Sequence, residues 1–478
     1  MSQRIFTSWL RGVGVTVLLL VAASAPGQTD VETSERIRHA LSGKAAGLPA
    51  VLHNEVLRFY TEVGFAPAWT TESELLPAAT AGLKILRRAP AFGLNPADYQ
   101  TREIELNLDS LQAAKTPEAR LQRRVAAELQ LTAGLLKLAT HLRRGRLHPV
   151  TLQPLAYAPD SVFDGVAWLL RARRTPQFEQ ELLRLQPTTR SYARLQWAWQ
   201  KLIRTDTAAA RKISDQVAVN LERLRWEPRN DSAYLVVNIP AYTLQIVRGP
   251  AVVRSHRVIV GGVPTPTPEV YSHVRFFQTS PEWKVPRSIA LNEILPRLRR
   301  APGFLAANNY VLYNQQGQQV NPHKINWKQV TPETFRYTIR QTACCDNALG
   351  NVVFRFPNTH DIFVHDTPAR KLFNAPRRAL SHGCIRLEKP FQLAAFLLRR
   401  DYGAGAQRQI ERMWDSVYGG YSKYFPLRNP MPIYIRYLTC HADDSAEIRT
   451  LPDVYQRDAQ VLQALLQASE QTTASVGE

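Results

Sequence analysis

The cysteine at position 384 has the surroundings of a nucleophile, because small and basic residues flank it. A cysteine attacks an acyl carbon as its thiolate, so it needs a neighbour that lowers its pKa or takes its proton. His365 lies upstream and is the candidate base. Gly383 has no side chain, which would let a substrate carbonyl approach the backbone N–H groups of Gly383 and Cys384 for oxyanion stabilisation. The stretch 381–387 therefore predicts acyl transfer through a thiol.

The neighbours of this cysteine each have a chemical and a structural interpretation. Residues two apart in an extended segment share a face, so Cys384 is expected to point the same way as His382 and Arg386. His382 would orient the thiol or simply hydrogen-bond its loop, and Arg386 would orient substrate or form a structural ion pair. His365 would be a base or a satisfied core histidine. The sequence leaves these alternatives open and favours the base.

The elements that must position these residues change character near residue 230. Over residues 31–226, apolar residues recur at three- and four-residue intervals, which predicts amphipathic helices. Short β-branched and aromatic runs then predict strands, and an excursion between them, residues 280–340, is a candidate lid. We expect an α+β chain with a helical scaffold domain at 31–228 and a mainly β catalytic domain at 229–440. A C-terminal tail at 441–478 should start helical and end polar.

Length and cysteine content indicate two or three domains with a large core. A chain of 478 residues needs no disulfide staples. It has four cysteines, of which Cys344 and Cys345 are adjacent and suit neither an ordinary bridge nor a paired zinc motif. Cys440 is interpreted, like these two, as an inert thiol, and a regulatory bridge from Cys344 or Cys345 to another chain is the alternative. We expect no disulfide framework and no metal site.

The chain is strongly basic, since 60 Lys and Arg against 40 Asp and Glu give a net charge of +20. Such a surface favours nucleic acid, anionic lipid or an anionic cell wall as partner. The arginines lack the interleaved aromatic residues of an RNA-binding sheet, so nucleic acid is not expected.

The N-terminus predicts the compartment. Arg4 and Arg11 precede an apolar run and small residues up to Ala25, the layout of a secretory signal peptide. Residues 1–25 are therefore expected to be a signal peptide or an N-terminal anchor. This places the protein in the periplasm or cell envelope and leaves membrane association and oligomeric state open.

Together these residues resemble the L,D-transpeptidases, whose catalytic module is the YkuD-like domain. The resemblance is to their larger periplasmic branch and covers nearly the whole mature chain. It rests on the runs His365-Asp366-Thr367-Pro368, Leu372-Phe373, Ser381-His382-Gly383-Cys384-Ile385-Arg386, Asn347-Ala348-Leu349-Gly350, Pro357-Asn358, Pro281 to Pro286, and, in the helical half, Phe59-Tyr60, Trp69, Gly93-Leu94 and Leu142-Arg143-Arg144-Gly145.

The resemblance implies a role for each motif residue. Cys384 is implied as nucleophile and His365 as general base, at the family's usual separation of 19 residues (384 − 365 = 19). Backbone N–H groups near His382, Gly383 and Cys384 are implied as an oxyanion hole. The implied fold is a β-sandwich with a capping segment drawn from 280–340. The residues implied to bind or orient substrate are Arg386, Ser381, Thr367 and Trp283.

The implied reaction joins third-position diamino acids of peptidoglycan stem peptides through a Cys384 thioester, without metal or organic cofactor. Carbapenems would be expected to acylate the same thiol. The alternatives are an L,D-carboxypeptidase or exchange enzyme on these stems, a catalytically silent wall-binding scaffold protein, and a cysteine peptidase of another fold. The sequence departs from its relatives in two ways: Cys344-Cys345-Asp346 stands where they usually read Pro-Gly, and Trp199 to Leu221 leaves no room for a peptidoglycan-binding insert.

Overall fold

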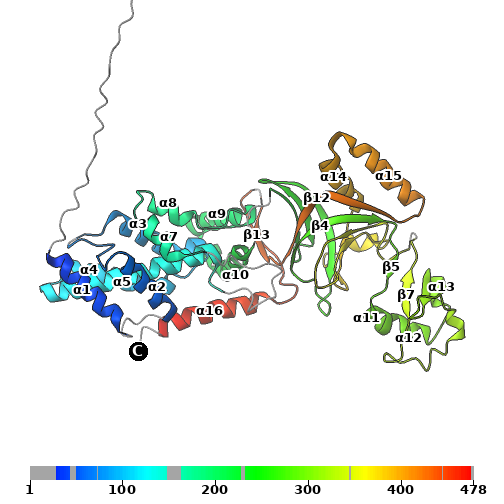
Figure 1. The fold of residues 1–478 in the computed structure, drawn as a ribbon, viewed down its shortest axis with the longest axis horizontal. Coiled ribbons are helices and arrows are strands. Elements are labelled where there is room, and N and C mark those ends of the chain that lie inside the picture. The colour runs from blue at the N-terminus through cyan, green and yellow to red at the C-terminus, as the bar shows by residue number, and fades with distance from the viewer. Residues whose placement is uncertain are drawn as a thin grey trace, which may run out of the picture.

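The computed structural model describes residues 28–43, 50–72, 74–147, 163–227, 232–343, 346–443 and 445–474. The expected signal segment, Cys344 and Cys345 lie outside these residues. Within the described ranges, no helix has the length and apolar character needed to span a bilayer. A helical part, a β-rich part and a small cap follow one another across Figure 1. The predicted α+β architecture, with helices before a mainly β domain, is confirmed.

The helical part is a bundle around the long helix α5 (Pro117–Arg144). Its start is fixed by Thr116, whose hydroxyl accepts the Ala119 N–H at 3.2 Å. Glu128 on α5 is fully buried and accepts the backbone N–H groups of Trp69 and Thr70 at 2.9 and 2.7 Å. These bonds compensate the cost of burying the carboxylate and tie the loop after α2 to the bundle. The other helices are α1 (Gln28–Ser42), α2 (Ala50–Glu62), α3 (Pro77–Arg87), α4 (Thr101–Ala113), α7 (Gly165–Ala172), α8 (Phe178–Leu183), α9 (Arg190–Thr205) and α10 (Thr207–Trp226).

The β-rich part is one sheet in the order β10-β3-β11-β9-β8-β4-β12-β1-β2, and β2 also pairs with β3. The hydrogen-bond ladder therefore closes on itself, so the expected sandwich is a single wrapped sheet. Its interior is apolar, with Val260, Phe277, Phe354 and Ile433 all buried, and helices α14 and α15 lie beside the sheet (Figure 1). The bounds are β1 (Ala233–Asn238), β2 (Thr243–Arg248), β3 (Ala251–Gly261), β4 (Val270–Thr279), β8 (Val352–Arg355), β9 (Val364–His365), β10 (Ala379–Ser381), β11 (Ile385–Leu387), α14 (Pro390–Tyr402), α15 (Ala406–Tyr418) and β12 (Lys423–Arg436).

The excursion after β4 folds into a separate small unit, which we call the cap. It has its own three-stranded sheet, in the order β5-β7-β6, and its own core around Leu298, Trp327 and Phe335. In Figure 1 it lies at the end of the molecule far from the helical part. The cap comprises β5 (Trp283–Lys284), α11 (Arg287–Ile289), η4 (Ala290–Ile294), α12 (Leu295–Leu298), α13 (Phe304–Ala307), β6 (Tyr310–Tyr313) and β7 (Thr338–Gln341).

The C-terminal segment returns to the helical part. Strands β13 (Cys440–Ala442) and β14 (Ile448–Thr450) form a hairpin, and α16 (Asp458–Ala474) then runs back beneath the bundle (Figure 1). Val461 and Leu465 of α16 are buried against Trp226 of α10. The segment expected as a tail therefore contains a helix that packs on the N-terminal half of the chain.

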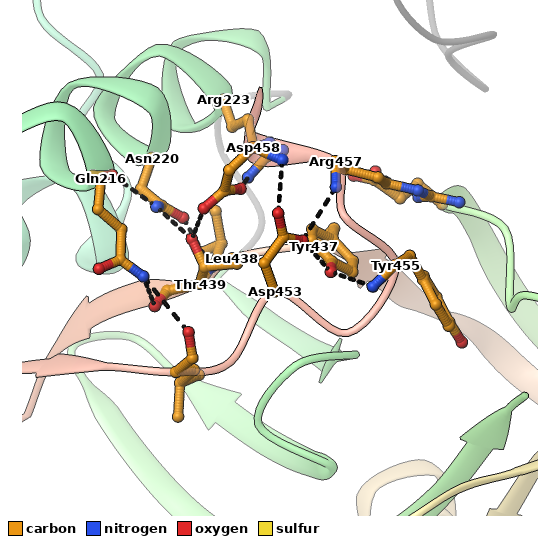
Figure 2. A network of polar contacts seen from close by, with 12 residues as sticks. Gln216, Asn220, Arg223, Tyr437, Leu438, Thr439, Asp453, Tyr455, Arg457 and Asp458 are labelled. Atoms are coloured by element: carbon orange, nitrogen blue, oxygen red, sulfur yellow. Dashed lines mark hydrogen bonds and ion pairs between the residues drawn. The ribbon is translucent and has the colours of Figure 1, made fainter. Parts of the chain in front are cut away.

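A network of polar contacts joins the two halves (Figure 2). On α10, the Asn220 side chain donates to Thr439 Oγ1 at 2.8 Å and accepts the Thr439 N–H at 2.9 Å. Arg223 pairs with Asp458 at 2.5 Å, and Thr439 donates to the other oxygen of that carboxylate at 2.6 Å. These bonds fix the last helix of the bundle against the strand that leaves the sheet.

Candidate active site

Two short neighbouring strands position the motif residues. Strands β9 and β11 pair in parallel, with Ile385 opposite Val364 and Arg386 opposite His365. Cys384 directly precedes β11, and Ile385 donates its N–H to the Phe363 carbonyl at 3.0 Å, which continues the pairing past the strand end. The thiol and the imidazole, 19 residues apart in sequence (384 − 365 = 19), therefore lie on adjacent strands.

Alternation along these strands places the paired polar residues away from the core. Val364, Ile385 and Leu387 point into the buried apolar cluster of the sheet. Since side chains alternate along a strand and paired residues share a face, Arg386 and His365 point to the opposite face. Cys384, which precedes β11, is partly buried and packs against the apolar cluster.

His365 is buried and neutral. Its Nδ1 lies 2.6 Å from the Asp366 carbonyl oxygen, and because a carbonyl only accepts, Nδ1 carries the proton and Nε2 is the free acceptor. Burial, assisted by the charge of Arg386, lowers the pKa of His365 to about 3, against the opposing effect of hydrogen bonds to the backbone of Asp366 and Leu349. At neutral pH the ring is therefore unprotonated.

Cys384 is a free, half-buried thiol. Burial raises its pKa, and the Phe363 backbone together with the charges of Arg355 and Arg386 acts in the opposite direction. Within the described chain, no hydrogen bond joins this thiol to the His365 ring. The resting pair is therefore a thiol and a neutral imidazole rather than a thiolate and an imidazolium.

The loop before the thiol is held from within. Ser381 is buried, donates its hydroxyl to the Cys384 carbonyl at 2.5 Å and accepts the Gly383 N–H at 3.2 Å. Thr267 donates to the Gly383 carbonyl at 2.7 Å. Gly383 has φ = +115°, a conformation that residues with a side chain rarely adopt. The sequence predicted the need for glycine here but not that Ser381 occupies its N–H group.

The other predicted residues are more scattered. His382 is exposed, and its Nε2 lies 2.6 Å from Oε1 of Glu293 in the cap, so it joins the motif loop to that unit. Thr367 is buried and accepts the Ala369 N–H at 3.3 Å. Trp283 belongs to the cap sheet, where its ring lies 6.4 Å from that of Tyr310.

Arg386 is half-buried, and within the described residues its guanidinium forms no ion pair or hydrogen bond. Burial lowers the pKa of Arg386, and the negative charge of a Cys384 thiolate would raise it. The structural ion pair that the sequence left open is therefore not formed among the described residues. No cluster of His, Cys, Asp or Glu in those residues is arranged to hold a metal ion.

Sequence reasoning missed three residues that act on the site. Arg355 at the end of β8 influences Cys384 electrostatically, as does Asp361 with the opposite sign. Buried Asp366 accepts the Asn351 N–H at 3.0 Å and so fixes the strand end that carries His365. Asp366 could have been found from the sequence because it directly follows the proposed base. Arg355 could be found only from the register between β8 and β9.

Comparisons with known proteins identify both halves of the chain. Residues 232–413 match the family described as L,D-transpeptidase catalytic domain (YkuD), and residues 54–198 match the scaffold domain. A protein of Haemophilus influenzae named "Putative L,D-transpeptidase" is 34% identical over 255 residues, which cover 53% of this chain and 50% of that protein. The chain thus spans about half the length of this curated relative.

Among solved structures, an L,D-transpeptidase from Mycobacterium smegmatis is similar over 44% of this chain and 60% of its own. The identity is 14% and the TM-score is 0.20. The matched catalytic range contains both Cys384 and His365, and the matched scaffold range precedes it. Residues 232–413 are therefore an L,D-transpeptidase (YkuD) catalytic domain, and residues 54–198 before it are a scaffold domain.

Proposed function

We propose that the protein is a peptidoglycan L,D-transpeptidase that cross-links third-position diamino acids through a thioester on Cys384. The observation that carries the proposal is the placement of a neutral, buried His365 on β9 and of Cys384 directly before the adjacent parallel strand β11. A thiol nucleophile with a neighbouring unprotonated imidazole is the pair of groups that acyl transfer by cysteine uses. The match of residues 232–413 to the L,D-transpeptidase catalytic domain supports the same reaction class.

In the first step, Sγ of Cys384 attacks the carbonyl carbon of the third residue while His365 Nε2 takes the thiol proton. The bond from that carbon to the nitrogen of the terminal D-alanine breaks, and the nitrogen receives the proton from His365. In the second step, the amine of a neighbouring stem attacks the thioester and gives a proton to His365, which returns it to the thiolate. Protons and electron pairs balance over the cycle without an external reagent.

The oxyanion of the tetrahedral intermediate needs backbone donors. We assign this role to the N–H groups of His382, Gly383 and Cys384, of which the Gly383 N–H is already bound to Ser381 at 3.2 Å. This is a long bond, and an oxyanion is the better acceptor because it is charged. Gly383 would therefore exchange a neutral acceptor for a charged one as the intermediate forms.

For substrate binding, we assign Arg386 to the stem because it is half-buried close to the thiol, on which its charge acts. Ser381 contributes by holding the loop. The roles of Thr367 and Trp283 in binding the stem remain predictions. A location in the periplasm or cell envelope is the natural one for a catalyst acting on peptidoglycan, and the net charge of +20 suits an anionic wall.

The test is acylation by meropenem, measured as the intact mass of the wild type and of Cys384→Ala. We expect one adduct on the wild type and none on the variant. An equal adduct on both proteins, or none on the wild type, contradicts the proposal and favours a silent wall-binding protein. The products formed from disaccharide tetrapeptides then distinguish cross-linking from carboxypeptidase or exchange activity. If His365→Ala turns these substrates over at the wild-type rate, another residue is the base.

A further inference from the structure

A second arginine lies on the face of the sheet that carries His365. Strand β8 pairs antiparallel with β9, with Val353 opposite His365 and Phe354 opposite Val364. Continuing this register places Arg355 opposite Phe363, on the side that carries His365. The Arg355 guanidinium carbon lies 4.9 Å from the centre of the Phe363 ring, and that ring lies 5.6 Å from the His365 ring. Three neighbouring strands therefore bring Arg355, His365 and Arg386 to one face, and the charges of both arginines act on Cys384.

Among the described residues, no acidic group pairs with Arg355. Within the described residues, neither Arg355 nor Arg386 forms an ion pair or hydrogen bond, and both side chains are only partly exposed. Arg257 on the adjacent strand β3 shows the contrast, since Glu388 neutralises it at 2.5 Å. Asp361 is the acidic group near the thiol, and it forms no ion pair with either arginine. Two unneutralised guanidinium groups beside a nucleophile favour an anionic ligand.

We propose that Arg355, together with Arg386, binds the carboxylate of the donor stem that lies next to the scissile bond, and so makes Cys384 selective for a stem ending in a free carboxylate. The inference rests on the proposed function. In a tetrapeptide stem, the terminal D-alanine carboxylate is one residue beyond the carbonyl that Cys384 attacks. The planar fork of a guanidinium matches a carboxylate in two parallel hydrogen bonds, and the Phe363 ring holds the Arg355 fork in place.

The first test does not depend on transpeptidase activity. Iodoacetate and iodoacetamide alkylate a thiol by the same displacement and differ mainly in charge, so their rate ratio at Cys384 reports the attraction for a carboxylate. Alkylation is followed by peptide mapping at Cys384, because the sequence also contains Cys344, Cys345 and Cys440. Burial raises the pKa of Cys440 to about 12 and protects it. We expect Arg355→Met to lower the iodoacetate to iodoacetamide ratio about tenfold, and Arg355→Lys to retain most of it.

The matched control is Arg248→Met, which removes the same charge from an exposed position at the end of β2. Its ratio should equal that of the wild type. An unchanged ratio in Arg355→Met, or an equal fall in Arg248→Met, would overturn the inference. Iodoacetamide alone shows whether the variant keeps a reactive thiol and hence a folded site.

The second test uses disaccharide tetrapeptides with three end groups: the free acid, the terminal carboxamide, and the free acid with the side-chain carboxylate of the diamino acid amidated. We expect the wild type to release the last residue from the free acid about tenfold faster than from the carboxamide, and Arg355→Met to lose this preference through KM. Equal preference in both proteins contradicts the role of Arg355. If the preference is lost only when the side-chain carboxylate of the diamino acid is amidated, the guanidinium binds that side-chain carboxylate. This outcome would contradict the assignment to the D-alanine carboxylate. No release by the wild type from any stem contradicts the proposed function instead, and the alkylation ratio still decides the role of Arg355.

Discussion

At the scale of single residues, burial sets the protonation of the proposed catalytic pair. It raises the pKa of the Cys384 thiol and lowers that of His365 to about 3. The thiol is therefore protonated at neutral pH and must lose its proton to the ring during attack. We expect the rate of Cys384 alkylation by iodoacetamide to keep rising with pH beyond the midpoint of an ordinary cysteine. A plateau below pH 7 would instead indicate a preformed thiolate.

His365 also links the stability of the fold to pH. The unfolded chain binds a proton at this residue below its ordinary pKa of 6.5, whereas the folded chain does so only near 3. Between these values the unfolded state carries more protons, so the free energy of unfolding falls as pH falls, by about 1.4 kcal/mol per pH unit. In denaturant titrations of His365→Asn between pH 6 and 4, the free energy of unfolding should lack this decrease with falling pH. The exposed His360→Asn is the matched control and should run parallel to the wild type.

The two proposed catalytic residues were predictable because their chemistry is carried by residue type and by short motifs. The residues that surround them were not. Arg355 reaches the thiol only through the register of β8 with β9, and Glu293 reaches His382 only through the fold of the cap. Such pairings are set by tertiary structure, which a pattern of apolar residues does not specify.

At the scale of elements, the turn before β8 depends on a glycine. Gly350 has φ = +60°, and a Cβ built there would lie 2.5 Å from the Asp366 side chain. Gly350→Ala should therefore cost about 2–4 kcal/mol of unfolding free energy, from backbone strain plus the displacement of Asp366. Gly249→Ala is the matched control, since its φ is +54° with nothing within 4 Å, and should cost only about 1 kcal/mol. Urea titration measures both, and equal losses would contradict the role of the Asp366 contact.

The cap is joined to the motif loop by the contact between Glu293 and His382. Both side chains are largely exposed, so the pair contributes no more than about 1 kcal/mol. Glu293→Ala should leave the melting temperature nearly unchanged but increase amide hydrogen exchange in residues 287–298 and 381–384. The matched control is Glu282→Ala, whose partner Arg340 at 3.2 Å lies within the cap itself. Increased exchange at 381–384 in the control as well would show that the link is not specific.

At the scale of the whole molecule, the helical and β-rich halves were predictable from the change in periodicity near residue 230, and the path of the last segment was not. The apolar residues of helix α16 pack on α10, more than 200 residues earlier in the chain. Because this partner is so remote in sequence, the sequence alone predicted a fraying tail. Asp458, at the start of this helix, joins the halves by binding Arg223 and Thr439 (Figure 2). Contacts of such long sequence separation leave no local pattern.

This junction predicts that the two halves unfold as one unit. The Arg223 side chain is only 3% exposed, so Asp458→Ala leaves a buried guanidinium without its carboxylate, at a cost of about 2–4 kcal/mol after allowance for the partial exposure of Asp458. Calorimetry should show one transition for the wild type and a broadened or double transition for the variant, because the bond that couples α10 to the end of the sheet is lost. Asp443→Ala removes an acidic residue from the same C-terminal hairpin, where it pairs with the exposed Arg449, and should leave the single transition intact. A single, unshifted transition in Asp458→Ala would mean that the apolar contacts of α16 alone couple the scaffold to the catalytic domain.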